Sequence, residues 1–130
     1  GLEGKFSVYF AAAVALVVGA VGVKQFTDEQ VRDPVVVALR DKVVATVDPA
    51  IHEDQVRAVV TLRDGRTLEK FIEHMVSSVE NPLSDEALEG KFLDLADGVL
   101  PTARARALLD LCWRIEELPG AAAVAEAARA

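Results

Sequence analysis

The chain has 130 residues and a net charge of −7, with 14 Lys and Arg side chains against 21 Asp and Glu. A chain of this length buries roughly two thirds of its unfolded surface, which is enough for one domain with a core. The acidic balance argues against nucleic-acid binding, because displacing phosphate counterions requires many cationic side chains.

The first predicted element is an apolar helix that opens with Lys5-Phe6-Ser7-Val8-Tyr9-Phe10 and ends near Gly19. Ser7 can cap its N-terminus, and the almost wholly apolar run that follows predicts a helix buried on nearly all sides. The apolar segment 8–23 has sixteen residues, fewer than the roughly 20 that span a bilayer, and it lacks a signal-peptide layout. We therefore expect a core helix and no membrane partner.

Two short helices and a strand are predicted next. Thr27 precedes the acidic turn Asp28-Glu29-Gln30, and Asp33 precedes Pro34; both patterns are helix start signals. The second of these helices should continue over residues 35–42. From residue 43 the side chains become β-branched, which predicts a strand over residues 43–47.

A β-hairpin is predicted around Asp64-Gly65. Residues 55–63 largely alternate between polar and apolar side chains, as a half-buried strand does. Asp64-Gly65 can supply the positive φ angles of a tight turn, so residues 67–74 should return antiparallel. Together with residues 43–47, the hairpin predicts a sheet of about three strands.

Helices are predicted for the rest of the chain. Asn81-Pro82 favours a turn, and Ser84 can cap a helix that ends near Gly98. A helix over 102–118 should follow, and the Ala-rich tail 121–130 should form a helix that docks weakly or frays. The apolar stripe of the 102–118 helix consists of Leu108, Leu111, Cys112, Ile115 and Leu118.

These elements predict an α+β fold in which a small antiparallel sheet of about three strands packs with helices and is followed by C-terminal helices. Cys112 is the single cysteine, so the chain has no internal disulfide, which fits a reducing compartment. Because free cysteine packs as a small hydrophobic residue, we expect Cys112 to be buried.

Three segments, in this order, resemble the C-terminal part of the MmgE/PrpD family, and the Asp64-Gly65 turn also lies in the expected place. The segments are Lys5 to Leu16, Gln25 to Pro34 and Asn81 to Phe92. The resemblance covers roughly residues 4–125. It implies that the chain is a fragment, with an N-terminally truncated α+β lid-like domain over 1–97. Residues 98–130 would then be helices that pack on a large helical domain missing here.

The family includes 2-methylcitrate dehydratases, cis-aconitate decarboxylases and iminodisuccinate epimerases. The resemblance therefore implies a cytoplasmic, dimeric lyase or isomerase that acts on a small di- or tricarboxylate, as in propionate metabolism, without a metal or organic cofactor. The fragment alone should be inactive. A different hypothesis is a stand-alone interaction or assembly module, whose apolar first helix and Leu-rich last helix bury against a partner. A long upstream coding region would favour the enzyme.

The resemblance also indicates site residues. The main catalytic histidines, aspartate and lysines of the family lie upstream, and the lid contributes a tyrosine three residues after the serine of the first segment. Here that position holds Phe10, and the tyrosine is Tyr9. Either Tyr9 reaches the pocket from a neighbouring angle or the chemistry differs. Lys5 and Ser7 are further candidates for substrate binding, although an exposed lysine and a helix cap are the simpler roles.

The histidines carry no metal-site or catalytic motif in the sequence. His52 lies in a polar loop and His74 ends a predicted strand, and neither has a ligand partner at the usual spacing. We expect both to be surface or edge residues, and we expect no metal site.

Overall fold

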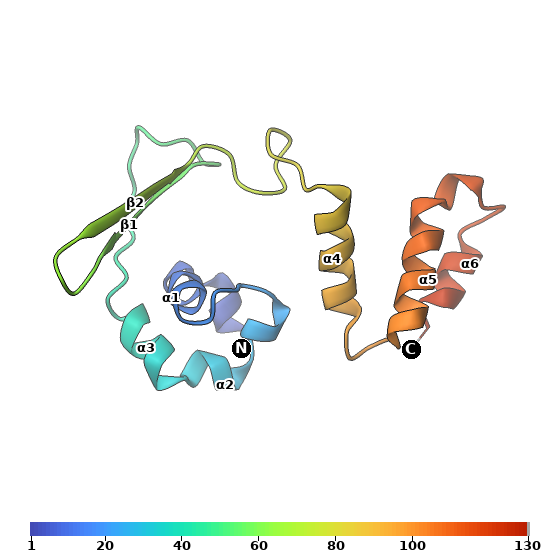
Figure 1. The fold of residues 1–130 in the computed structure, drawn as a ribbon, viewed down its shortest axis with the longest axis horizontal. Coiled ribbons are helices and arrows are strands. Elements are labelled where there is room, and N and C mark those ends of the chain that lie inside the picture. Colours follow the sequence, from blue (N-terminus) through green and yellow to red (C-terminus); the bar gives the residue numbers. More distant parts are fainter. Residues whose placement is uncertain (130) are drawn as a thin grey trace. The chain divides into compact units, whose positions relative to one another are not determined.

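The structure, a computed structural model, describes residues 1–129. The chain divides into two compact units, Gly1–Ala50 and Ile51–Ala130, and each has its own buried side chains. Along the chain, one small antiparallel sheet follows a first set of helices and precedes a second set (Figure 1). The predicted α+β class is therefore confirmed. The predicted boundary at residue 97 concerns packing on the large helical domain and stays a prediction.

The N-terminal unit is built from short helices, of which α1 packs against α3 and α3 also contacts α2. In chain order these are η1 (Glu3–Phe6), α1 (Val8–Val18), η2 (Val23–Gln25), α2 (Asp28–Arg32) and α3 (Pro34–Arg40). The end of α1 at Gly19, which has a φ of 77°, is the predicted one, because a left-handed residue terminates a helix and glycine adopts it without strain.

The three predicted helix starts of this unit are capped by side-chain oxygens, as their sequences indicate. Each oxygen accepts a hydrogen bond from a backbone N–H of the first turn, which has no partner within the helix. The bonds run from Phe10 N–H to Ser7 Oγ (3.2 Å), from Gln30 N–H to Thr27 Oγ1 (3.2 Å), and from Val35 and Val36 N–H to Asp33 Oδ1 (2.8 and 3.1 Å).

The core of the N-terminal unit lies between α1 and α3 and consists of Phe10, Ala13, Val14 and Val36. The prediction that α1 is buried on nearly all sides is wrong. Its other faces expose large apolar side chains, among them Leu16 at 58%, because the short helices of this unit cover only one side of it. No helix within residues 1–129 is long and apolar enough to cross a membrane.

Residues 43–47 form no strand, although their β-branched side chains predict one. Val44 and Val47 are 83% and 97% exposed. β-propensity reflects how well a side chain fits against neighbouring strands, and within residues 1–129 no strand pairs with this segment. The sheet therefore has two strands and not three.

The sheet is a hairpin of β1 (Val56–Thr61) and β2 (Thr67–Ile72), in which Val56 pairs with Ile72 and Thr61 with Thr67. Leu62 N–H donates to the Arg66 carbonyl (2.8 Å) and Gly65 N–H donates to the Leu62 carbonyl (3.0 Å). Within this turn only Gly65 has a positive φ, of 85°. The turn is therefore a three-residue loop and not the predicted two-residue one with two positive φ angles.

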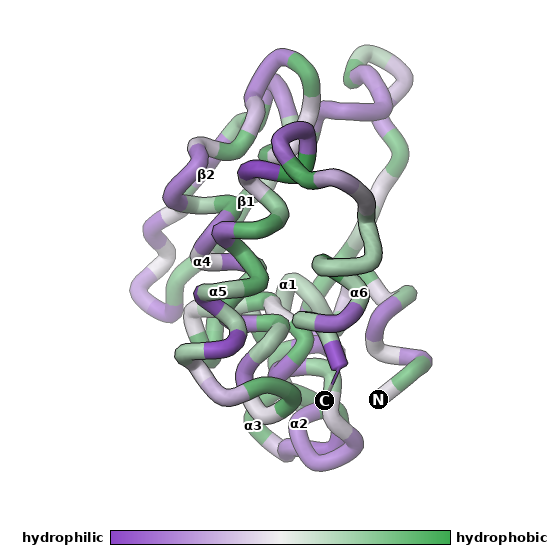
Figure 2. The backbone as a smooth tube through the Cα atoms, turned by 90° about the vertical axis from the view of Figure 1, so that its right-hand side faces the viewer, coloured by the Kyte–Doolittle hydropathy of each residue, from purple (hydrophilic) through white to green (hydrophobic). Residues whose placement is uncertain are grey.

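Apolar and polar residues are mixed along both strands of the hairpin (Figure 2). Cross-strand partners share a face, so Val56, Val60 and their partners Ile72 and Leu68 lie together. Val56 and Leu68 are 52% and 56% exposed. The more apolar face of the sheet is thus partly open to solvent.

The C-terminal unit continues with helices, and α5 packs against both α4 and α6. Ser84 Oγ caps α4 by accepting from Ala87 N–H (3.2 Å), as predicted. Gly98, with a φ of 78°, follows the end of α4, also as predicted. The elements are α4 (Asp85–Ala96), α5 (Thr102–Trp113), η3 (Ile115–Glu117) and α6 (Ala122–Ala127).

Two expectations for the C-terminal helices are wrong. The helix predicted over 102–118 ends at Trp113, and a 3₁₀ turn follows it. Cys112 is exposed and not buried. The buried face of α5 consists of Ala105, Leu108 and Leu109. Cys112 lies on the same face, one turn nearer the C-terminal end of α5, and is exposed there. Trp113 Nε1 also donates to Glu89 Oε1 (2.8 Å), which joins α5 to α4.

Candidate functional site

The four residues predicted to form a site lie around the start of α1. Lys5 is exposed in η1, and Ser7 is the N-cap residue of α1. Tyr9 and Phe10 follow within the first helical turn, where consecutive side chains point about 100° apart. Ser7 accepts the Phe10 N–H bond described above, so its hydroxyl fixes the turn that carries Tyr9 and Phe10.

Phe10 is a core residue of the N-terminal unit and is 1% exposed. Its ring lies 5.7 Å from the ring of Phe26 at an interplanar angle of 56°, which is a favourable arrangement of aromatic quadrupoles. Gly4 packs closely as well, since a Cβ built there would lie 3.2 Å from Phe10 Cδ1. The substrate contact predicted for Phe10 stays a prediction, but its ring points into the core.

Tyr9, in contrast, is 44% exposed. No residue within 1–129 forms a hydrogen bond with its hydroxyl. Of these two neighbours, Phe10 is therefore buried in the core of the unit, whereas Tyr9 is partly exposed to solvent. Whether it meets a substrate stays a prediction, as do the roles of Lys5 and Ser7.

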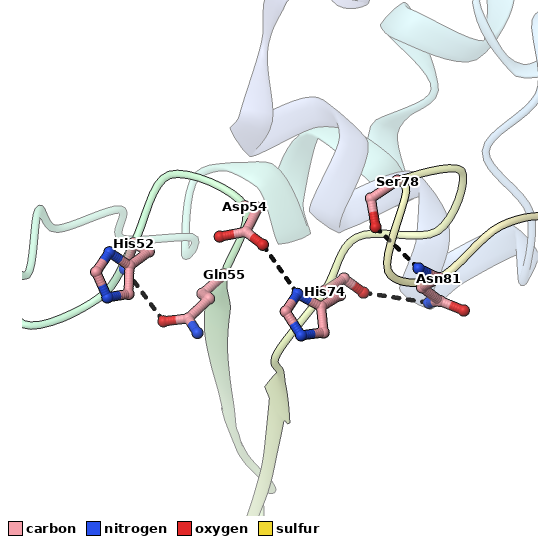
Figure 3. A network of polar contacts seen from close by, with 6 residues as sticks. All are labelled: His52, Asp54, Gln55, His74, Ser78 and Asn81. Carbon is pink, nitrogen blue, oxygen red and sulfur yellow. Dashed lines mark hydrogen bonds and ion pairs between the residues drawn. The ribbon is translucent and has the colours of Figure 1, made fainter.

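A second group of polar side chains lies at the open end of the hairpin (Figure 3). His74 follows β2 and Asp54 precedes β1, and His74 Nδ1 lies 3.0 Å from Asp54 Oδ2. Both side chains are partly buried, at 37% and 32% exposure. Gln55 Oε1 accepts from the backbone N–H of His52 (3.1 Å) and fixes the turn before β1. The antiparallel pairing of β1 and β2 brings these residues together.

The Asp54–His74 contact stabilises the charged form of each partner. The hydrogen bond from His74 lowers the pKa of Asp54, against a smaller opposing effect of desolvation. The bond to Asp54 raises the pKa of His74, and the carboxylates of Glu73 and Glu80 add to this rise. The carboxylates of Asp54, Glu73 and Glu80 give His74 negatively charged surroundings.

Glu80 completes a group of three possible metal ligands. One ligand atom each from Asp54, His74 and Glu80 lies within 4.8 Å of the others. The loop after β2 turns back on itself, because Asn81 Nδ2 donates to the His74 carbonyl (3.2 Å) and Ser77 N–H donates to the Asn81 carbonyl (2.9 Å). This turn returns Glu80 to the neighbourhood of His74.

Sequence reasoning missed this group because its members are far apart along the chain. Asp54 and His74 are separated by 20 residues, so no short ligand spacing marks them. The Asp64-Gly65 turn signals the hairpin, but a two-residue loop would place Asp54 opposite Met75. The three-residue loop shifts the register by one and places Asp54 opposite His74 just beyond the ladder.

Comparison with known proteins identifies the family. A family model described as the MmgE/PrpD C-terminal domain matches residues 1–115, which include the start of α1, the hairpin and α4. The comparison with curated proteins gave no match. The matched region contains all three segments on which the resemblance rests, and it covers most of the chain. The chain therefore belongs to the MmgE/PrpD family and contains the C-terminal domain of that family.

Proposed function

We propose that the chain is the C-terminal part of a cofactor-independent lyase or isomerase that acts on a small di- or tricarboxylate, similar to 2-methylcitrate dehydratase. The family match over residues 1–115 is the observation that carries this proposal. In the whole enzyme, the chain supplies the lid and the terminal helices, and the main catalytic groups lie on a large upstream domain. The same family membership makes a cytoplasmic dimer the expected form.

Tyr9 is the side chain that we assign to the substrate pocket of the whole enzyme. It is partly exposed, whereas Phe10 at the tyrosine position of the family is 1% exposed. A phenol hydroxyl can donate a hydrogen bond to an oxygen that gains negative charge in the transition state. Lys5, exposed just before α1, would attract a substrate carboxylate, and Ser7 would act as a positioning residue by fixing the first turn.

The His74–Asp54 pair has the chemistry of a general base, but its charge does not suit this substrate class. Asp54, Glu73 and Glu80 are the charged neighbours that act on His74. A di- or tricarboxylate would be repelled by these groups. We therefore leave the pair out of the proposed reaction and expect the isolated chain to have no turnover.

The exposed apolar faces favour a second candidate, an interaction module without enzymatic activity. In the N-terminal unit Val8, Leu16 and Val23 are 59%, 58% and 56% exposed, respectively. Exposed apolar side chains that form a patch commonly mark a protein interface. A lid that has lost its large domain would expose the same residues. The enzyme proposal accounts for both the exposure and the family match, so we prefer it.

The decisive experiment is an assay of the full-length protein that contains this chain. Dehydration of methylcitrate and citrate, decarboxylation of cis-aconitate and epimerisation of iminodisuccinate are measured in parallel, with the isolated chain as the control. We expect saturable turnover of one of these compounds by the full-length protein alone. A folded full-length protein that turns over none of them would refute the enzyme proposal, and turnover by the isolated chain would refute the lid assignment.

A further inference from the structure

At the open end of the hairpin, three side chains of types that commonly bind metals lie close together. Asp54 comes before β1, His74 follows β2, and Glu80 lies in the loop beyond. The close-up in Figure 3 shows the Asp54 carboxylate and the His74 ring turned toward each other across the hairpin. An imidazole and two carboxylates supply one nitrogen and two oxygen donors.

The distances are close to those of a ligand set. Zinc bonds to nitrogen and carboxylate oxygen are about 2.0–2.2 Å long, so two ligand atoms of one tetrahedral ion lie about 3.4 Å apart. The Nδ1 to Oδ2 distance is 3.0 Å, and the widest separation within the set of three is no more than 4.8 Å. A movement of at most about 1.5 Å by the exposed Glu80 side chain would bring all three atoms to the separation of tetrahedral ligands.

The loop that carries Glu80 is held in place. Ser78 N–H donates to the Met75 carbonyl (3.1 Å), and Asn81 N–H donates to Ser78 Oγ (3.1 Å). Ser77 has a φ of 76°, a left-handed conformation that a serine adopts only at some cost. The position of Glu80 near His74 thus follows from a fixed turn of the backbone.

The charge of the group distinguishes between possible ligands. Three carboxylates, those of Asp54, Glu73 and Glu80, act on His74. This arrangement attracts a cation. The imidazole favours a borderline transition metal such as Zn²⁺ over Mg²⁺, which prefers oxygen ligands in an octahedral set.

We propose that Asp54, His74 and Glu80 bind a divalent transition-metal ion, with Zn²⁺ as the preferred ion. The ion ties the residue before β1 to the residues after β2 and so closes the open end of the hairpin. Its role is structural, since the proposed reaction does not use it. Three protein ligands leave one coordination position for water.

The experiment uses the untagged chain after treatment with a chelator, because a histidine tag would bind the probe. Zn²⁺ is titrated by calorimetry. We expect one ion per chain and at least about tenfold weaker binding for His74→Ala, since a lost ligand costs no less than a lost supporting contact. The matched control is His52→Ala, which removes the other histidine of the chain and should bind as the wild type does.

A second pair of variants covers the case in which His74→Ala disturbs the fold. Glu80 and Glu53 are both exposed, so neither Glu80→Gln nor Glu53→Gln should alter folding. Only Glu80→Gln should weaken Zn²⁺ binding, and Mg²⁺ in excess should not displace Zn²⁺ from the wild type. Backbone amides of β1 and β2 should exchange more slowly once Zn²⁺ is bound, because the hairpin ends are then held together.

Three results would overturn the proposal. The first is a wild-type chain that binds no Zn²⁺ at millimolar concentration, which would leave Asp54 and His74 as an ordinary ion pair. The second is binding that persists unchanged in both His74→Ala and Glu80→Gln. The third is an equal loss in the His52→Ala and Glu53→Gln controls, which would indicate non-specific binding to the acidic surface.

Discussion

Truncation of Phe10 tests the packing of the N-terminal unit. Phe10 is 1% exposed and belongs to a core of only four buried residues. Phe10→Ala removes a ring that packs against Phe26 and should cost about 3–5 kcal/mol. Because about 1.4 kcal/mol corresponds to a factor of ten, the open form of the unit should become at least about 100-fold more populated. A core this small has little stability in reserve, so the unit is expected to unfold.

The matched control is Tyr9→Phe on the same helical turn. Tyr9 is 44% exposed, so loss of its hydroxyl should change the stability by less than about 0.5 kcal/mol. Phe10→Tyr should lie between the two, at about 1–3 kcal/mol, because it forces a hydroxyl into an apolar core.

Amide hydrogen exchange measures these effects locally. Protection of α1 should fall in Phe10→Ala and persist in Tyr9→Phe, while α5 in the other unit serves as the internal reference. Equal protection of α1 in all three variants would show that Phe10 is not the core residue described here. Loss of protection in α5 as well would show that the two units unfold together.

Four further predictions concern other parts of the chain. In the full-length enzyme, Tyr9→Phe should lower turnover about tenfold or more, since a transition-state hydrogen bond is worth roughly 1–3 kcal/mol; unchanged kinetics would remove Tyr9 from the site. The isolated chain should self-associate through its exposed apolar side chains, and strictly monomeric light scattering at high micromolar concentration would contradict this. Gly65→Ala should destabilise the hairpin by about 1–2 kcal/mol, because residue 65 has a φ of 85°. Gly90→Ala should stabilise α4 by up to about 1 kcal/mol, because an added Cβ there would meet nothing within 4 Å. Urea unfolding of the two variants distinguishes these effects. The backbone N–H and guanidinium of Arg66 lower the pKa of Asp64. The ionised carboxylate therefore stabilises the turn at pH values above the ordinary pKa of an aspartate, and this stabilisation is lost as the pH falls through the lowered pKa. Carboxyl titration by NMR checks the direction of the pKa change.

The sequence predicted those features that depend on neighbours a few residues away. Ser7 and Ser84 cap their helices because the N–H groups they bond lie three residues further on. Gly19 and Gly98 mark helix ends for an equally local reason. The family resemblance, which depends on such local segments in a fixed order, is confirmed by the match over residues 1–115.

The features that sequence reasoning got wrong depend on partners distant in the chain. Residues 43–47 have the side chains of a strand but no partner strand within the described chain. The exposure of Cys112 depended on how far along α5 its apolar face is buried, since Leu108 and Leu109 on the same face are buried and Cys112 is not. The contact of Asp54 with His74 depended on the register of β1 and β2. Local pattern indicates the type of an element, whereas packing decides which of its faces is buried.

The short loop of the hairpin has a consequence for how the C-terminal unit folds. β1 and β2 are neighbours in the chain, so pairing them closes only a small loop, and such hairpins form within about 1–10 microseconds. Within residues 1–129 each strand pairs on one side only, which leaves two edges with unpaired backbone N–H and carbonyl groups. Edges of this kind accept strands from other molecules. At high concentration, aggregation of this chain should therefore begin at the hairpin, early in folding and before slower helix docking is complete.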